Sequence, residues 1–235
     1  MTKKGTSCYE PKATNPATNT PSQRKDERTT MPSITLYTNP MSRGRTARWM
    51  LEEVGQPYDV VVLDFGPSMK TPEYLAINPM GKVPALKHGD SIITECAAIC
   101  TYLADAFPEA KLMPENRASF YRWMFFAAGP VNHAMADASA GIINATEQQR
   151  GHSGYGCMDD VVRVLSQHLT ASPYVCGQEF SAADVYLGDV ICMGIEFGML
   201  KPNDVFTAYA NRIRERPARA RAVKMDTDLM PKQNP

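Results

Sequence analysis

The sequence lacks the cysteine patterns of redox-active, zinc-binding and disulfide-stabilised proteins. It contains no Cys-x-x-Cys pair, and its six cysteines are spread along the chain instead of forming a compact framework. They are Cys8, Cys96, Cys100, Cys157, Cys176 and Cys192. We expect them to be reduced and mostly buried, which indicates a cytoplasmic protein.

An excess of charge and long apolar runs are also missing. The 25 basic and 25 acidic residues give a net charge of +0, so nothing favours nucleic acid or an anionic membrane as a partner. No apolar run approaches the ~18 residues that a membrane span requires. The four histidines form no cluster with Cys or Asp at ligand spacing, so no metal site is predicted.

The first part of the chain, residues 1–31, has almost no large apolar side chain and is rich in Thr, Pro, Asn and charge. Such a segment cannot bury a core, so we expect a disordered N-terminal extension. It has no apolar stretch typical of a secretory signal, and Glu10, Asp26 and Glu27 argue against a transit peptide. Translation starting at Met31 is a hypothesis that an intact mass of the native protein would test.

Residues 32–112 alternate between strand and helix patterns. Ala47, Met50, Leu51 and Val54 form one apolar helix face, which ends at Gly55. In chain order we expect strand 34–37, helix 47–54, a buried strand 58–63, a short helix 70–77, a hairpin of strands 85–88 and 91–94, and helix 99–106. The order βαβαββα is that of a thioredoxin-like domain.

Residues 117–225 show only helical patterns, and we expect an all-α helical bundle followed by a polar tail, 226–235. A long helical stretch, 120–138, is interrupted at Gly129-Pro130, and the polar, Gly-rich segment 149–156 is predicted to be a loop. Ser181 and Asp184 have the spacing of a helix N-terminal cap, which should begin the buried central helix of this domain.

The most informative motif runs from Asn78 to Leu86 and reads Asn-Pro-Met-Gly-Lys-Val-Pro-Ala-Leu. Pro84 has no N–H to donate to a neighbouring strand, and a cis bond after Val83 would leave the Val83 N–H and C=O free to pair with an extended peptide. Glu95 then opens a helix, whose free N–H groups and dipole favour a carboxylate. The two features together suit glutathione, a peptide with two carboxylates.

This motif, followed by Thr94-Glu95-Cys96, resembles the glutathione S-transferase family, and the resemblance covers about residues 32–225. It implies a bacterial-type cytosolic transferase with a Ser-type active site, glutathione as co-substrate and a homodimeric assembly. The activity implied is addition of the glutathione thiolate to a small hydrophobic electrophile.

The catalytic group should lie where the first strand ends. The segment Thr38–Arg45 contains no cysteine, so the nucleophile should be the thiol of glutathione itself. Lowering its pKa of ~8.5 by ~2 units takes roughly 2.7 kcal/mol. One hydroxyl hydrogen bond to an anion supplies ~1.5–3 kcal/mol, and a helix N-terminus adds ~0.3–1, so no metal is needed.

Ser42 is the first candidate for the thiolate donor, and an N-cap is its alternative role. Tyr37 lies where some classes of the family place a catalytic Tyr, although it could be a packed strand residue. Arg43 could stabilise the thiolate by charge, or it could simply face solvent.

The remaining glutathione contacts follow from the resemblance. Val83 would pair its backbone with the cysteinyl unit, and Glu95 would hold the γ-glutamyl amine. Lys70 and Lys82 lie where relatives bind the glycine carboxylate, although each could be a surface charge. Cys96 replaces the usual Ser and is a weaker donor, so the γ-glutamyl carboxylate would depend on backbone N–H groups; Cys96 could alternatively be a redox-sensitive thiol.

The family places its electrophile pocket between the two domains. Met124, Phe125, Asn132 and His133 are the candidates, although a Met or aromatic residue at helical spacing also suits a core. His133 could be an acid-base group.

Two other functions stay open at the level of the sequence. A glutathione-dependent peroxidase or disulfide reductase would use the same thiolate, and a non-catalytic transferase-like binding module would keep the fold without turnover. The retained Val83-Pro84 and Glu95 favour an intact site, whereas Cys96 and the unsettled catalytic hydroxyl favour the binding module.

Overall fold

The structure is a computed structural model, and it describes residues 33–143 and 146–230. The predicted N-terminal extension 1–31 lies outside these residues, as does the end of the predicted polar tail. No helix in the described part of the chain is both long and apolar enough to cross a membrane.

A mixed four-stranded sheet forms the centre of the N-terminal half, with the strand order β2-β1-β3-β4. The strands are β1 (Ile34–Thr38), β2 (Asp59–Val62), β3 (Ala85–His88) and β4 (Ser91–Thr94). β1 runs parallel to β2 and antiparallel to β3, and β3 forms the predicted hairpin with β4.

The expectation that β2 is a buried strand is wrong. Among the described strands, β2 lies at the edge of the sheet and pairs only with β1, and Val61 and Val62 are 37% and 41% exposed. A continuous run of β-branched residues fits a strand covered on both faces as well as it fits an edge strand. The sequence does not show which strand lies at the edge of the sheet.

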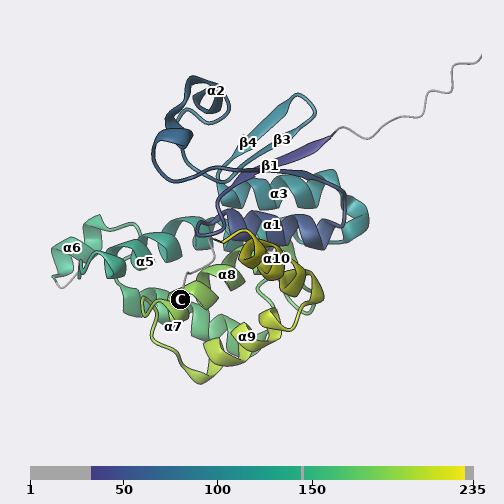
Figure 1. Ribbon diagram of the computed structural model, residues 1–235. Helices are drawn as coiled ribbons and strands as arrows, with labels where there is room; N and C mark the ends of the chain where they lie inside the picture. Colours follow the sequence, from purple (N-terminus) through teal and green to yellow (C-terminus); the bar gives the residue numbers. More distant parts are fainter. Residues whose placement is uncertain (1–32, 144–145, 231–235) are drawn as a thin grey trace, which may run out of the picture. The chain divides into compact units, whose positions relative to one another are not determined.

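Helices α1 (Gly44–Val54) and α3 (Cys96–Ala106) pack against one face of the sheet, and α2 (Pro72–Leu75) lies on the other side (Figure 1). α1 ends as predicted at Gly55, whose φ of 75° is left-handed and whose N–H donates to the Leu51 carbonyl. The predicted helix 70–77 is split into a 3-10 turn (Pro67–Lys70) and α2, because Thr71 precedes Pro72 and is therefore held in an extended conformation. The order βαβαββα of a thioredoxin-like domain is confirmed.

The C-terminal half is helical, as predicted. After a short 3-10 turn (Pro108–Ala110), its elements are α4 (Arg117–Phe126), a π-helical turn (Ala127–Val131), α5 (Asn132–Ser139), α6 (Glu147–His152), α7 (Met158–Ala171), α8 (Ala182–Glu196), α9 (Asp204–Arg214) and α10 (Pro217–Asp228). The interruption at Gly129-Pro130 is the π-helical turn, where Pro130 has no N–H to continue the helix. Part of the predicted loop 149–156 is instead α6, which is stabilised by reciprocal bonds between Thr146 and Gln149.

The predicted central helix is α8, and Asp184 connects its start to its surroundings. The Asp184 carboxylate accepts hydrogen bonds from the N–H and hydroxyl of Ser181, from the N–H of Val175 and from the hydroxyl of Tyr209, at 2.8–3.0 Å. Asp184 therefore both caps α8 and joins it to α9 and to the loop before it.

We expect Asp184→Asn to lower the free energy of unfolding by about 1–3 kcal/mol, because an amide NH2 in place of one oxygen leaves a buried donor without an acceptor. Urea unfolding followed by circular dichroism measures this loss as a lower midpoint at an unchanged m-value. Asp159→Asn, on the exposed side of the first turn of α7, is the control and should change little. Equal midpoints for the two variants would contradict the role given to Asp184.

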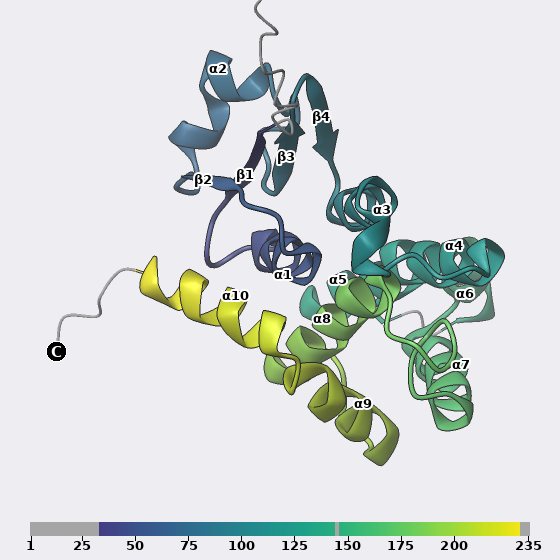
Figure 2. The same cartoon turned by 90° about the vertical axis from the view of Figure 1, so that its right-hand side faces the viewer.

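The last helix, α10, packs along α1 (Figure 2). The guanidinium of Arg48 in α1 donates to the carboxylate of Asp226 in α10 at 2.8 Å, and both side chains are at most 3% exposed. We expected a polar tail to begin at residue 226, but residues 226–228 are the end of α10. Asp226 is part of the buried contact between the two halves.

Candidate functional site

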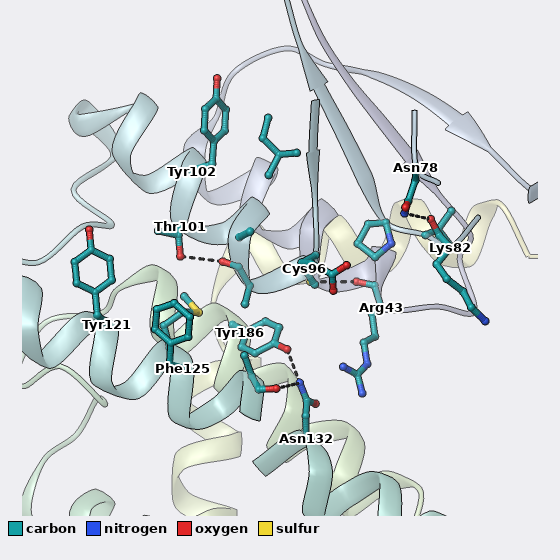
Figure 3. Close-up of a pocket in the computed structure, with 18 of the residues that line it drawn as sticks. Arg43, Asn78, Lys82, Cys96, Thr101, Tyr102, Tyr121, Phe125, Asn132 and Tyr186 are labelled. Carbon is teal, nitrogen blue, oxygen red and sulfur yellow. Dashed lines mark hydrogen bonds between the residues drawn. The ribbon is translucent and has the colours of Figure 1, made fainter. Parts of the chain in front are cut away.

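A cleft of about 910 Å³ opens between the N-terminal half and the helices of the C-terminal half. Its walls come from the turn before β3, the start of α3, and helices α4, α5 and α8 (Figure 3). Ten of the predicted site residues line it: Arg43, Lys82, Val83, Pro84, Glu95, Cys96, Met124, Phe125, Asn132 and His133.

The turn before β3 presents main-chain groups to this cleft. The Val83–Pro84 bond is cis, as predicted, and neither the N–H nor the C=O of Val83 has a hydrogen-bond partner among the described residues. The preceding carbonyl, of Lys82, is held by the hydroxyl of Tyr74 at 2.6 Å and by the amide of Asn78 at 2.8 Å. Tyr74 and Asn78 are buried beneath the turn and keep Val83 in place.

Gly81 is required for this turn. Its φ is 56°, and a Cβ placed on it would lie 2.4 Å from the Met69 carbonyl oxygen. The glycine of the motif is therefore needed both for its backbone conformation and for space.

The start of α3 supplies the second part of the site. Glu95 has φ 64° and ψ 119°, a region that side-chain-bearing residues rarely adopt, and its carboxylate makes no capping bond. Within the described part of the chain, the N–H groups of Cys96, Ala97 and Ala98 have no acceptor, because the first bond of α3 is from Ile99 to the Glu95 carbonyl. An acidic side chain and a set of free N–H donors thus lie at the same helix end, as the sequence predicted.

The start of α1 meets the start of α3 in this region. The thiol of Cys96 donates to the main-chain carbonyl of Arg43 with the sulfur 3.6 Å from the oxygen. The Arg43 guanidinium extends into the cleft and has no ion-pair or hydrogen-bond partner among residues 33–143 and 146–230 (Figure 3). Arg43 therefore brings into the cleft a positive charge that no described residue compensates.

Three predicted residues, Ser42, Tyr37 and Lys70, are not among those that line the cleft. The Ser42 hydroxyl donates to the Asn39 carbonyl at 2.7 Å and accepts from the Gly44 N–H at 2.9 Å. The N-cap of α1 is Arg43, so Ser42 lies one residue before the cap position considered as its alternative role. Tyr37 packs against Tyr74 with ring centroids 5.8 Å apart.

Lys70 donates to the Met80 carbonyl at 2.8 Å. Of the two lysines proposed for the glycine carboxylate, Lys70 and Lys82, only Lys82 lines the cleft.

The cysteines near the cleft are buried. Cys96 is 7% exposed, and Cys100, one turn later, is fully buried in the core, as expected. A hydrogen bond with Cys96, together with burial, raises the pKa of the Cys100 thiol well above its usual range. Cys100 is therefore a thiol with a structural role.

The apolar part of the cleft comes mainly from α4. Met124 is 2% exposed and belongs to the core beneath the wall, whereas the Phe125 ring is 70% exposed and covers the surface of the wall. His133 lies at the exposed rim on α5. Of the two roles considered for these residues, Met124 therefore has the core role and Phe125 the pocket role.

Sequence reasoning missed Tyr186. It lies in α8, where an aromatic residue suits a buried helix and gives no separate signal, yet it lines the cleft and accepts a hydrogen bond from the Asn132 amide at 2.5 Å. Tyr121 and Thr101 also line the cleft and were not predicted.

Among the described residues, no group of three His, Cys, Asp or Glu side chains has an arrangement suited to a metal ion. The cleft offers main-chain donors and acceptors, the Glu95 carboxylate, two cations without a partner among the described residues (Arg43 and Lys82), and an apolar wall. Such a set suits an extended peptide with a free amine and carboxylates, next to an apolar molecule.

Comparisons with known proteins agree with this geometry. The family described as "Glutathione S-transferase, N-terminal domain" matches residues 32–105. The chain is 27% identical over 193 residues to the glutathione S-transferase GstA of Escherichia coli O157:H7, covering 77% of this chain and 93% of that protein.

Two solved structures show the same fold. A glutathione S-transferase from Xylella fastidiosa is 29% identical with a TM-score of 0.67, covering 83% of this chain and 98% of that one. A theta class glutathione S-transferase from Xanthomonas axonopodis pv. citri, with glutathione bound, is 30% identical with a TM-score of 0.64, covering 82% and 98% respectively.

Proposed function

Because the chain belongs to the glutathione S-transferase family, we propose that it is a transferase that adds the thiolate of glutathione to a small hydrophobic electrophile. The observation that carries this proposal is that the unpaired main chain of Val83, the Glu95 carboxylate and the free N–H groups of α3 share one cleft with an apolar wall. The transferase names of the relatives favour conjugation over the peroxidase, reductase and binding-module alternatives.

In this proposal glutathione binds along the turn before β3. Val83, with its neighbour Pro84, pairs its main chain with the cysteinyl unit, as a strand pairs with a sheet edge. Glu95 holds the γ-glutamyl ammonium, and the N–H groups at the start of α3 hold the γ-glutamyl carboxylate in place of a side-chain hydroxyl at Cys96. Lys82 is better placed than Lys70 for the glycine carboxylate, because Lys70 already donates to the Met80 carbonyl.

The thiolate is stabilised from the start of α1. The unpaired Arg43 guanidinium provides positive charge, and Ser42 provides a hydroxyl if it exchanges its bond to the Asn39 carbonyl for one to the sulfur. A charge-assisted bond of about 1.5–3 kcal/mol would be sufficient to lower the thiol pKa by ~1–2 units.

The remaining features of the proposal follow from the family. We propose a cytoplasmic homodimer with a role in detoxification, in which residues 32–112 form the glutathione-binding domain and residues 117–225 the helical domain. The electrophile binds against Met124, Phe125, Asn132 and His133.

The test is a pH titration of thiolate ultraviolet absorbance, with glutathione bound to the wild type, Ser42→Ala and Arg43→Met. We expect a wild-type midpoint well below the free value of ~8.5, and a rise of about 1 unit in Ser42→Ala. Ser68→Ala is the matched control, because the Ser68 hydroxyl bonds to the Asp64 carbonyl outside the cleft and its loss should leave the midpoint unchanged.

Each other outcome has a defined meaning. A titration midpoint that rises only in Arg43→Met would show that the Arg43 guanidinium, and not the Ser42 hydroxyl, stabilises the thiolate. Wild-type protein that binds no glutathione, or binds it without lowering the thiol pKa, would refute the transferase proposal in favour of the binding module.

A further inference from the structure

A second, smaller cavity lies next to the cleft. Its volume is about 190 Å³, and its wall shares Arg43, Asn132, Ala136 and Tyr186 with the wall of the cleft. Figure 3 shows the Arg43 side chain extending from the start of α1 in the direction of Asn132. Arg43 therefore borders both cavities, while its guanidinium lies in the cleft.

Asp189, in α8, gives the second cavity a carboxylate that is only partly compensated. It is 8% exposed, and its Oδ2 accepts a hydrogen bond from the Thr46 hydroxyl. In the described part of the chain, its Oδ1 has only an ion-pair contact with Nη2 of Arg219 in α10, at 3.8 Å, which is beyond hydrogen-bond distance. Burial raises the pKa of the Asp189 carboxyl, the Thr46 bond and the charges of Arg219 and Arg45 oppose this rise, and Glu196 adds to it.

Asn132 supplies a second acceptor that lacks a donor. Its Nδ2 group contacts the Ala128 carbonyl and the Tyr186 hydroxyl, but its Oδ1 is buried and has no hydrogen-bond partner among the described residues. A buried acceptor without a donor is costly. The wall of the second cavity thus contains two residues, Asp189 and Asn132, that each have an oxygen without a hydrogen-bond donor.

The Arg43 side chain has the donors that these oxygens lack. A guanidinium carries five N–H donors and a positive charge, and that of Arg43 has no partner among residues 33–143 and 146–230. The main chain of Arg43 is fixed, because its carbonyl accepts from the Thr46 N–H at 3.1 Å and from the Cys96 thiol at 3.6 Å. Rotation between staggered side-chain conformations can therefore move the guanidinium from one cavity to the other while α1 stays in place.

We propose that the Arg43 guanidinium has two positions, and that Asp189 is a positioning residue that competes with the glutathione thiolate for it. The outer position, in the cleft, is the one that the structure shows. The inner position, in the second cavity, places the guanidinium on the free oxygens of Asp189 and Asn132. This inference rests on the proposed transferase function and adds a device that distinguishes thiolate from product.

The distinction follows from charge. A thiolate attracts the guanidinium to the outer position, whereas the thioether of the conjugated product has no charge and leaves it free to return to Asp189. If the inner position is occupied for ~70–90% of the time in the free protein, the apparent affinity for the thiolate is lowered about 3- to 10-fold, because only the outer position binds it. The affinity for a thioether does not depend on the position of Arg43.

The test compares glutathione with S-methylglutathione, whose sulfur cannot ionise, by calorimetry on the full chain at a pH above the wild-type thiolate midpoint. We expect Asp189→Asn to lower the Kd for glutathione about 3- to 10-fold and the thiolate midpoint by about 0.5–1 unit, and to leave the Kd for S-methylglutathione unchanged. Glu196→Gln is the matched control, since it removes an exposed carboxylate from the same helix that lines neither cavity, and should change neither Kd.

A double variant tests whether Asp189 acts through Arg43. In an Arg43→Met background, Asp189→Asn should change neither Kd, because no guanidinium is left to release. A gain in glutathione binding of the same size in that background would show that Asp189 acts without Arg43 and would overturn the proposal.

The other outcomes separate this inference from the function on which it rests. Unchanged binding of glutathione in Asp189→Asn, or an equal change for both ligands, would overturn the two positions of Arg43 and leave the transferase function standing. Wild-type protein that binds neither ligand would refute the transferase function and this inference with it.

If Asp189→Asn does not fold, Val190→Phe provides the same comparison. Val190 lines the second cavity but not the cleft, so a larger side chain there should exclude the guanidinium from the inner position and tighten the binding of glutathione alone. Binding of glutathione at the wild-type Kd in this variant would contradict the inner position.

Discussion

Glu95→Gly should strengthen the fold and at the same time weaken glutathione binding. Glu95 has φ 64° and ψ 119°, and a residue held in so sparse a region costs about 1–3 kcal/mol. Glycine adopts positive φ without that steric cost, although it loses more backbone entropy on folding, so we expect a net gain of about 1 kcal/mol. The Glu95 carboxylate has no partner among the described residues, so its loss removes no contact within the protein.

The binding side of this prediction is larger. Loss of the carboxylate removes the group proposed to hold the γ-glutamyl ammonium, and a hydrogen-bonded pair of charges in a cleft is worth about 1.5–3 kcal/mol. We therefore expect the Kd for glutathione, measured by calorimetry, to rise by about 10- to 150-fold.

Glu95→Ala separates the two effects. It removes the same carboxylate but retains a Cβ, so it should lose binding to the same extent without the gain in the midpoint of urea unfolding. A Glu95→Gly protein that binds glutathione as tightly as the wild type would exclude the proposed role of Glu95. A protein that loses binding but gains no stability would show that the backbone at this position stores no strain.

Asp226→Leu should lower the free energy of unfolding by about 3–5 kcal/mol, the largest loss of stability that we expect from one substitution. Asp226 and Arg48 form a hydrogen-bonded ion pair at 2.8 Å between α10 and α1, with side chains 1% and 3% exposed. Removing one partner leaves the other charge buried and uncompensated. For a chain of this size, the loss corresponds to a fall in Tm of about 6–20 °C, measured by scanning calorimetry.

The double variant Arg48→Met with Asp226→Leu is the informative comparison. One guanidinium nitrogen of Arg48 and one carboxylate oxygen of Asp226 are buried and have no hydrogen-bond partner in the described part of the chain, so the pair does not fully compensate its own desolvation. An apolar pair of similar volume should therefore be more stable than either single variant, and close to the wild type. Single variants that unfold at the wild-type temperature would show that α10 does not depend on this ion pair.

Local patterns in the sequence determined most of the architecture. The alternation of strand and helix signals is short-range, because helix faces, Gly and Pro breaks and capping residues act within a few positions of one another. The order βαβαββα, the end of α1 at Gly55, the break at Gly129-Pro130 and the capping contacts of Asp184 were therefore all predictable. The exposed edge position of β2 was not, because strand order in a sheet is a long-range property.

The candidate site divides in the same way. The motif around Val83 and the opening of α3 at Glu95 are local, so the sequence alone placed free main-chain groups and an acidic side chain there. Which side chain stabilises the thiolate remains a prediction. The Ser42 hydroxyl bonds to the Asn39 carbonyl and the Gly44 N–H in this structure, so a measurement of the bound thiol has to decide between Ser42 and Arg43.

Tertiary structure alone brought Tyr186 to the cleft and Asp226 to Arg48. The contacts of Tyr186 with Asn132 and of Asp226 with Arg48 join helices that are far apart in the chain. In the sequence, Tyr186 is one more aromatic residue in the buried α8, and Asp226 is one more acidic residue near the end of the polar α10, so neither gives a separate signal. Periodicity specifies the face of a helix on which a side chain lies. The partner of that face is decided only when the helices pack, because packing depends on the combined shape and charge of surfaces from distant segments.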